Sequence, residues 1–521
     1  MRTSYRLPLL FCVIVLFLMG RTALGQMTDN TQAKNTAAAG INKSLEDEIG
    51  AGRGNVNTPG SSIYIIKRDP FRSIRRGRQL FQRKFTRAQG QGPNEGDGVG
   101  DLNTDIAIGA GLADSCALCH GRPRGSAGAG GNVVTRPDSR DSPHLFGLGL
   151  KEMLADEITR DLRARRDLAV LKAHRLHRPV TMSLASKGIS YGTITANPDG
   201  TLNTSGVRGV DPDLRIKPFF ADGSAFSIRQ VIVANLHNEM GLEASADPDI
   251  LAASHGGRVI TPSGMILDGS QDKIPPPPAP DPENGNEVDP AIVDHMEFYL
   301  LNYFKPAHDE QDDTTERGRE AFDRIGCGSC HVANLIINHD RRVADVETDH
   351  DPVHGIFNKL YATATTLYYT KDDGTGNPPL KLPLDQPFVV KDIYTDFKCH
   401  DLGSNFYERN WDGTMQTTFL TRPLWGVGST GPYGHDGRSM TLNDVILRHG
   451  GEAQTSTKAF VALAAEQRNA VIAFLNSLVL FPPDDTASNL DPGDPTQPYF
   501  PQFGHGSIKL TVLFNDPTDL E

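Results

Sequence analysis

The sequence has little of three things: long apolar runs, positive charge and alternating, strand-like patterns. Beyond the N-terminus, no apolar run approaches the roughly 20 residues that a transmembrane helix needs, so no membrane insertion is expected. The 52 Lys and Arg residues are outnumbered by 64 Asp and Glu, and the formal net charge is -12. Nucleic acids and anionic membranes are therefore poor candidate partners. The scarcity of strand signals favours a helical fold.

Residues 1–25 have the features of a secretory signal peptide. Two arginines precede an apolar core at 9–19, and small residues follow it. This order is typical of a cleaved signal, and the core is too short to span a bilayer. We therefore predict an exported protein, located in the periplasm, whose mature chain begins with an N-terminal extension at 26–68.

Two short stretches, CALCH and CGSCH, contain four of the five cysteines that remain after the signal. Disulfide bridges or a zinc site are the alternatives in an exported chain, but neither explains two complete Cys-x-x-Cys-His units. In such a unit, two thiols about one helical turn apart bind the vinyl groups of a haem, and the histidine ligates the iron. We therefore predict two covalently bound c-type haems, on Cys116, Cys119 and His120 and on Cys327, Cys330 and His331.

The surroundings of the two haem motifs resemble each other, which indicates a duplicated domain. Three segments of the first half, RRGRQLFQRKF, SPHLFGLG and FFADGSAFSIRQVI, correspond in order to ERGREAFDRI, TRPLWGVG and YGHDGRSMTLNDVI of the second. We predict cytochrome c domains at 69–272 and 288–485, a proline-rich linker at 273–287 and a tail at 486–521.

The segments that follow each Asp-Gly pair have apolar residues at helical spacing, with Ser227 and Thr441 placed to cap the helices. We therefore predict an all-α fold of two cytochrome c-like domains with long irregular insertions. Short β-hairpins are expected in the insertions, one of them within 187–218, and SIKLTVLF near the C-terminus has the pattern of an added strand.

Together these segments resemble the bacterial diheme cytochrome c peroxidase and MauG superfamily, and above all its diheme oxidoreductase branch. Besides the haem motifs, the resemblance rests on DSPHLFGLGL, NEMG, YTDFKCHDLG, TRPLWGVGSTGPYGHDGRSMTL and LRHGGEA. It extends from about residue 75 to about residue 480. It implies that peroxide meets the N-terminal haem, while the C-terminal haem stores or relays electrons.

The resemblance also implies which groups complete the two haem sites. The sixth ligand of the second haem falls on His449, giving a bis-histidine iron, and a surface histidine at a helix end is the alternative. No histidine lies between His120 and His144 to close the first site, and we interpret His144 as structural. Glu239 of NEMG corresponds to the distal glutamate that moves protons as the O–O bond breaks. His237 is its rival, because it would close the site by ligating the iron.

A calcium ion between the domains is a further implication of the resemblance. Asp141, Thr430 and Pro432 correspond to its ligands, and all three offer hard oxygen atoms. An ordinary Pro-Tyr turn is the alternative.

Four other positions bear on the two haems. The inter-haem tryptophan of the superfamily corresponds to Ala221, so an indole relay is not expected. Arg422 and Arg438 are candidates for binding haem propionates, with surface positions as the alternative. Cys399, the unpaired cysteine, is interpreted as a buried thiol.

These observations predict an exported diheme oxidoreductase of peroxidase type. Its expected partners are hydrogen peroxide or another small oxidant, and a small donor protein such as a cytochrome c or cupredoxin, or an unknown reducing substrate. A non-catalytic diheme electron carrier is one alternative. A diheme oxygenase of the rubber oxygenase type is the other.

Overall fold

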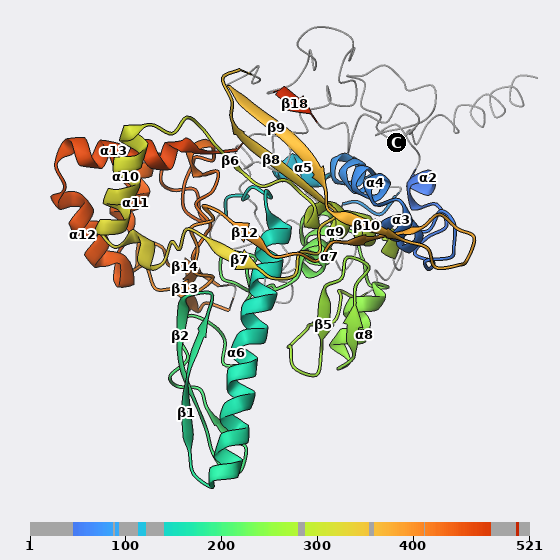
Figure 1. Cartoon of the computed structure of the whole chain (residues 1–521), viewed down its shortest axis with the longest axis horizontal. Coiled ribbons are helices and arrows are strands. Elements are labelled where there is room, and N and C mark those ends of the chain that lie inside the picture. Colours follow the sequence, from blue (N-terminus) through green and yellow to red (C-terminus); the bar gives the residue numbers. More distant parts are fainter. Residues whose placement is uncertain are drawn as a thin grey trace, which may run out of the picture.

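The computed structural model describes residues 45–86, 89–92, 113–120, 140–279, 287–353, 359–410, 412–480 and 507–509 (Figure 1). The predicted signal peptide at 1–25 and most of the predicted tail lie outside the described residues. Within the described part of the chain, no helix is long and apolar enough to cross a membrane.

Helices occur along the whole described chain. They are α2 (Leu45–Ile49), α3 (Ser62–Arg68), α4 (Pro70–Gln82), α5 (Cys116–Cys119), α6 (Leu148–Leu176), α7 (Ile228–Met240), α8 (Pro248–Ser254), α9 (Pro290–Leu301), α10 (Asp313–Arg324), α11 (Leu442–Arg448), α12 (Gln454–Ala462) and α13 (Ala465–Ser477), with 3-10 turns η3 (Cys327–Ser329), η4 (Val427–Ser429) and η5 (Gly451–Ala453).

The strands are short. They are β1 (Val180–Ser186), β2 (Ile189–Ala196), β3 (Leu202–Asn203), β4 (Arg258–Ile260), β5 (Ile266–Asp268), β6 (Ala307–His308), β7 (Leu335–Ile337), β8 (Ala344–His350), β9 (Leu360–Thr366), β10 (Tyr368–Lys371), β11 (Leu380–Pro383), β12 (Phe388–Val390), β13 (Cys399–His400), β14 (Glu408–Arg409), β15 (Met415–Gln416), β16 (Phe419–Leu420), β17 (Leu478–Val479) and β18 (Ser507–Lys509).

The prediction of an all-α fold is wrong, because these strands form eight small sheets of two or three strands among the described residues. The pair β8–β9 explains the error. Asp345 and Thr348 of β8 are buried beside Val346, so its sequence, ADVETDH, lacks the apolar alternation that marks a half-buried strand. The strand expected in SIKLTVLF is present as β18, which pairs in parallel with β9.

Each haem motif follows a helix that crosses a second helix at a glycine. In the first half α4 packs on α9, and a Cβ on Gly77 would lie 2.2 Å from the carbonyl oxygen of His295. In the second half α10 packs on α13, and a Cβ on Gly318 would lie 2.0 Å from that of Ala470. Both distances are far below van der Waals contact, so these close crossings require glycine.

The Asp-Gly segments also have the same local structure in both halves. An antiparallel bridge joins Phe219 to Ala225 in the first and Tyr433 to Ser439 in the second. Ser227 and Thr441 then begin α7 and α11 with capping boxes, as predicted. The internal repeat is therefore present in the backbone, while the domain boundaries remain predictions.

The α6 helix and the β1–β2 hairpin project together from the body of the molecule (Figure 1). Ala169 and Ala173 of the helix meet Ala196 of β2 in a small core of their own. The turn of this hairpin lies at Lys187 and Gly188, both of which have positive φ. Its first strand begins at Val180, which is before the segment 187–218 where a hairpin was expected.

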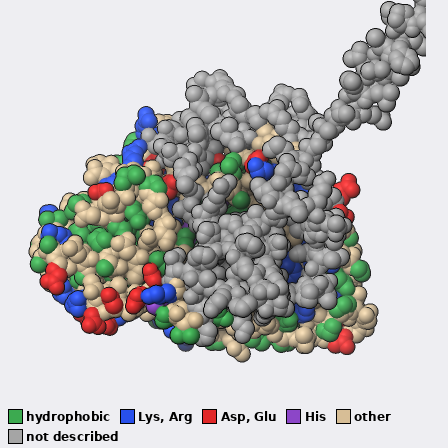
Figure 2. All heavy atoms as spheres, turned by 90° about the horizontal axis from the view of Figure 1, so that it is seen from above, with side chains coloured by type: hydrophobic (Ala, Val, Ile, Leu, Met, Phe, Trp, Pro, Cys, Tyr) green, Lys and Arg blue, Asp and Glu red, His purple; other side chains and the backbone are tan. Residues whose placement is uncertain are grey.

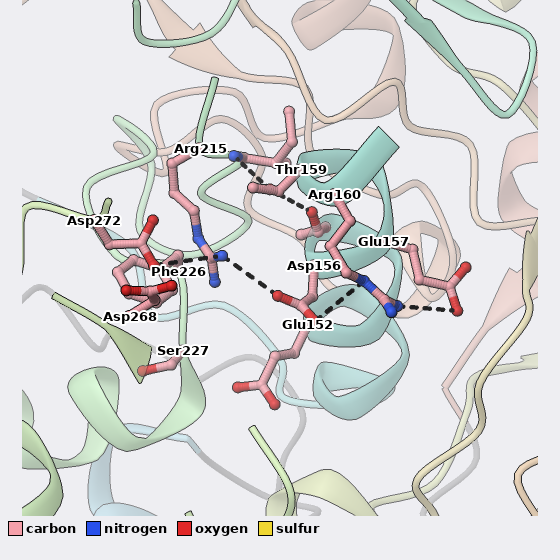
Figure 3. Close-up of polar contacts among 12 residues, drawn as sticks. Glu152, Asp156, Glu157, Thr159, Arg160, Arg215, Phe226, Ser227, Asp268 and Asp272 are labelled. Atoms are coloured by element: carbon pink, nitrogen blue, oxygen red, sulfur yellow. Dashed lines mark hydrogen bonds and ion pairs between the residues drawn. The ribbon is translucent and has the colours of Figure 1, made fainter. Parts of the chain in front are cut away.

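Carboxylates in the first half of α6 anchor the helix to the body (Figure 3). Asp156 Oδ1 lies 3.3 Å from Arg215 Nη1. Glu152 accepts the first backbone N–H of α7 at 2.6 Å, and Glu157 accepts those of 338–339 at 2.7 and 2.9 Å. These hydrogen bonds offset the cost of burying the carboxylates, and they tie α6 to the chain that follows the second haem motif.

Candidate haem sites

The first haem motif forms α5, whose single turn brings Cys116 and Cys119 to one side. His120 follows as its C-cap, and its Nδ1 lies 2.8 Å from the carbonyl oxygen of Pro143. Because a carbonyl oxygen only accepts, Nδ1 carries the proton and Nε2 is the nitrogen available to iron. Burial lowers the pKa of His120, so the imidazole is held in the neutral form that ligates a metal.

The second motif repeats this arrangement on different elements. Cys327 begins η3, and Nδ1 of His331 lies 3.0 Å from the carbonyl oxygen of Tyr394. Burial lowers the pKa of His331 to about 4. The ring of Phe322, from the glycine-containing helix α10, lies 6.1 Å from the imidazole, as Phe81 of α4 lies 6.3 Å from that of His120.

His449, the predicted sixth ligand, ends α11 as its C-cap. Its Nδ1 lies 2.6 Å from the carbonyl oxygen of Val445, which again leaves Nε2 for a metal. His449 is close enough to contribute to the lowered pKa of His331. The structure therefore brings the two predicted ligands of the second haem together.

The cysteines fit covalent haem attachment. All five described cysteines are free thiols, so the disulfide alternative is not what this structure contains. Burial raises the pKa of Cys116 and of Cys327 to about 12. Two thiols one turn apart next to an oriented imidazole match the donor set of a c-type haem.

Glu239 and His237 lie in the last turn of α7, beside the first haem motif. The Glu239 carbonyl accepts the backbone N–H of Ala113 at 3.0 Å, and the Glu239 carboxylate adds to burial in raising the pKa of Cys119. Nδ1 of His237 lies 3.0 Å from Oε1 of Glu243, which orients the ring. Glu239 therefore lies near Cys119 of the first motif, while the His237 ring is held by Glu243.

The predicted calcium ligands are partly brought together. The backbone N–H of Asp141 donates to the carbonyl oxygen of His435 at 2.9 Å. A Cβ on Gly437 would lie 3.3 Å from Cβ of Asp141 and 3.4 Å from Cγ of Pro432, so both residues border this glycine. Burial, helped by Asp436, raises the pKa of Asp141 to about 6. A cation at this carboxylate would relieve that cost.

The two arginine candidates differ. Burial lowers the pKa of Arg422 to about 10, with Arg140 adding to the effect. Lys151, which the sequence analysis missed, is also buried, and its pKa falls to about 7 through burial and Arg422. Buried cations that repel each other suit an anionic ligand such as a haem propionate. Arg438 is half-exposed and lies 3.5 Å from Asp436, a surface ion pair.

Residues 335–478 match the family model described as di-haem oxidoreductase, putative peroxidase. Over this segment, the chain is similar to the di-haem oxidoreductase family. The matched segment begins just after His331 and includes Arg422, Arg438 and His449. The resemblance found in the sequence is therefore confirmed, and with it a diheme redox role.

A search of curated proteins found no similar sequence. Among solved structures, hydrazine synthase of Kuenenia stuttgartiensis is 12% identical with a TM-score of 0.34, over 87% of this chain and 98% of that one. A MauG-like protein associated with microbial copper homeostasis is 13% identical with a TM-score of 0.25, over 55% of this chain and 78% of that one. Likenesses this weak establish neither a shared fold nor an activity.

His144 from the first half of the chain contacts Trp425 from the second half. His144 Nε2 lies 3.1 Å from the carbonyl oxygen of Trp425, and burial lowers the pKa of His144 to about 3. A Cβ on Gly147 would lie 2.6 Å from the Trp425 ring. Ala221, at the position that corresponds to the inter-haem tryptophan, is buried and packs against Phe406 and Phe419. Phenylalanines thus fill the space around the position that corresponds to the inter-haem tryptophan.

Two polar clusters near the haem motifs were missed by the sequence analysis. Glu408, from the short strand β14, pairs with Arg140 at 2.7 Å and lies 3.2 Å from Nε2 of His435. Arg140 and Glu408 are 268 positions apart in the sequence, so no local pattern indicates that they pair.

The second cluster surrounds His400. Its Nε2 lies 2.9 Å from Asp396 and its Nδ1 2.8 Å from Glu452. Together with Cys330 and Asp396, His400 forms a group of metal-ligand type among the described residues. Cys399 next to it has its pKa raised to about 12 by burial, which suits an inert thiol.

Proposed function

We propose that this chain is an exported diheme c-type oxidoreductase of peroxidase type, with hydrogen peroxide as its oxidant. One observation carries the proposal. His120 is oriented for iron by Pro143, and Glu239 is near enough to Cys119 to raise the pKa of its thiol. These two contacts support a proximal ligand and a carboxylate at one haem site. When bound there, a haem with an open position supplies peroxide binding and electron transfer.

Glu239 is the proposed catalytic residue. Its carboxylate takes the proton from the peroxide oxygen next to the metal and returns it to the departing oxygen, which leaves as water. His331 and His449 would be the two protein ligands of a haem at the second site, leaving no open position for peroxide, and that haem would supply electrons to the first site.

The test is to mix the oxidised holoprotein with peroxide and to follow the Soret band. Glu239→Gln keeps size and hydrogen bonding but cannot accept a proton, so peroxide consumption should slow by about 10²- to 10⁴-fold. Glu320→Gln, an exposed carboxamide change on α10, is the control and should leave the rate unchanged. An unreactive parent protein with a purely low-spin spectrum would remove the proposal.

The His237–Glu243 hydrogen bond favours a second candidate function, that of a non-catalytic electron carrier. Carboxylates commonly orient metal-bound histidines in this way. If His237 ligates the iron of the first haem, resonance Raman spectra of the ferric protein should show that both haems are six-coordinate and low-spin. Added cyanide should then not bind. His237→Gln would then create a high-spin haem. Under the peroxidase proposal, the unmutated protein already has a high-spin haem at the first site.

A further inference from the structure

The projecting part of the molecule carries a charge opposite to that of the whole. We define the arm as the outer part of α6 from Arg160 onward with β1 and β2 (Figure 1). Between Arg160 and Arg178 the sequence has seven Lys and Arg but only two Asp, a formal charge of +5. Since the whole chain has a net charge of -12, the remainder has -17.

Four of the seven cations face solvent. The other three have partners: Arg163 lies 2.7 Å from Asp272, and Arg160 and Arg166 lie near carboxylates of α6 itself. The exposed cations, for which the described residues offer no ion pair, are Arg165, Lys172, Arg175 and Arg178. Spacings of seven and three place Arg165, Lys172 and Arg175 along one side of the helix.

Leucines lie among these cations. Leu168 is 37% exposed, Leu171 64% and Leu176 51%. The inner face of the helix already packs against the hairpin through Ala169 and Ala173. The leucines on the outer face therefore gain nothing from the fold of the monomer, and a mixed apolar and cationic stripe of this kind is typical of a protein-binding helix.

The chain itself contains an acidic surface of matching charge. The segment 309–323, which includes most of α10, has seven Asp and Glu against two Arg, a formal charge of -5. Its exposed carboxylates include Asp312, Asp313, Glu316 and Glu320. Acidic side chains lie along the edge of the lobe that α10 to α13 form (Figure 2). This lobe is far from the tip of the arm in the same molecule (Figure 1).

We propose that the arm binds a second copy of this chain and that its cationic stripe lies against the acidic face of α10 in the partner. Opposite charges of equal size steer the two copies together and fix the register, while the leucines supply the apolar contact. Because the pairs are exposed, salt weakens the contact.

The test is the mass of the holoprotein by light scattering at low and at high salt. The parent should be a dimer at low salt and dissociate at high salt. Arg165→Glu/Lys172→Glu/Arg175→Glu should abolish the dimer, and so should Asp312→Lys/Glu316→Lys/Glu320→Lys. Combining both sets in one chain restores opposite charges and should restore the dimer.

The matched control is Lys371→Glu/Lys458→Glu, which reverses two exposed lysines outside the arm and should leave the dimer intact. Haem content and circular dichroism establish that each variant is folded. A parent that is monomeric at low salt overturns the proposal, even if the arm binds an acidic foreign protein or anionic vesicles. A combined variant that stays monomeric while both single sets are folded overturns the pairing with α10.

Discussion

Gly318→Ala adds a single methyl group at the crossing of α10 and α13. The new Cβ would lie 2.0 Å from the carbonyl oxygen of Ala470, 2.6 Å from its carbonyl carbon and 2.8 Å from Cβ of Phe474. All three neighbours belong to one helix, and two are backbone atoms that no rotamer change moves. The helices must therefore separate by about 1 Å or more to reach normal contact distances.

Two opposing effects determine how much Gly318→Ala changes the free energy of unfolding. Alanine is a better helix former than glycine by about 1 kcal/mol, which stabilises α10. Overpacking of a close-packed interior costs about 1–3 kcal/mol, and the backbone clash places this case at the upper end. The net result is a destabilisation of about 1–2 kcal/mol, or a fall in Tm of about 2–8 °C for a domain of this size.

Separating α10 from α13 should also affect the second candidate haem site. Phe322 of α10 packs against Phe474 with ring centroids 5.6 Å apart and against Tyr394 at 5.9 Å. The Tyr394 carbonyl orients His331. Moving α10 therefore loosens the imidazole, and the fraction of high-spin haem should rise together with the fall in Tm.

The assay is thermal unfolding of the holoprotein followed at 222 nm and in the Soret band. Gly77→Ala, at the equivalent crossing of α4 and α9, should behave in the same way, and the exposed change Glu320→Ala on α10 should not. A Gly318→Ala protein as stable as the parent, with an unchanged Soret band, would refute the close crossing.

Three further outcomes are expected. His449→Ala should convert the second haem from low-spin to high-spin, as read by electron paramagnetic resonance, because it removes the sixth ligand. Burial lowers the pKa of His144 to about 3, so below its usual pKa of 6.5 the unfolded chain binds a proton that the folded chain does not. Stability should therefore be full above pH 6.5 and fall by about 4 kcal/mol toward pH 3, and His144→Gln should flatten this loss in urea titrations. If calcium binds at Asp141, chelation should lower the Tm of the parent but not of Asp141→Ala, and calcium affinity should decline below about pH 6 as protons compete for the carboxylate.

Candidate haem-binding residues could be chosen from the sequence because their chemistry is local. Cys116, Cys119 and His120 are contained in one turn of chain, and the spacing alone identifies them. The groups that orient the ligands were not predictable. The Pro143 carbonyl lies 23 positions after His120, and the Tyr394 carbonyl 63 positions after its own histidine, and a carbonyl oxygen leaves no trace in the sequence.

The sheets escaped prediction for a different reason. Two-residue strands such as β13, β14 and β16 are too short to have a period, and β8 buries polar residues. Asp345 can be buried there because Arg342 Nη1 lies 2.6 Å from it. The tertiary partner, rather than the local pattern, decides the conformation of this segment.

The two metal sites differ at one position of a repeated helix. His449 lies eight residues after Thr441, and the residue eight after the equivalent cap, Ser227, is Asn235. Both helices begin with the same capping box, and φ of His449 is still -63°, so its Cβ direction is that of a helical residue. An asparagine does not ligate haem iron, so under the proposed ligation the first site would lack the imidazole that His449 would supply to the second.

Asn235→His should therefore close the first site. We expect the high-spin signal of the ferric holoprotein to be replaced by a second low-spin signal, and the reaction with peroxide to be lost. Asn235→Gln, which lengthens the side chain without adding an imidazole, should leave both unchanged. If Asn235→His remains high-spin and reactive while the protein is folded and fully loaded with haem, α7 and α11 do not present this position to their metals in the same way. The difference between the two sites would then have to come from the last turn of α7, where His237 and Glu239 lie.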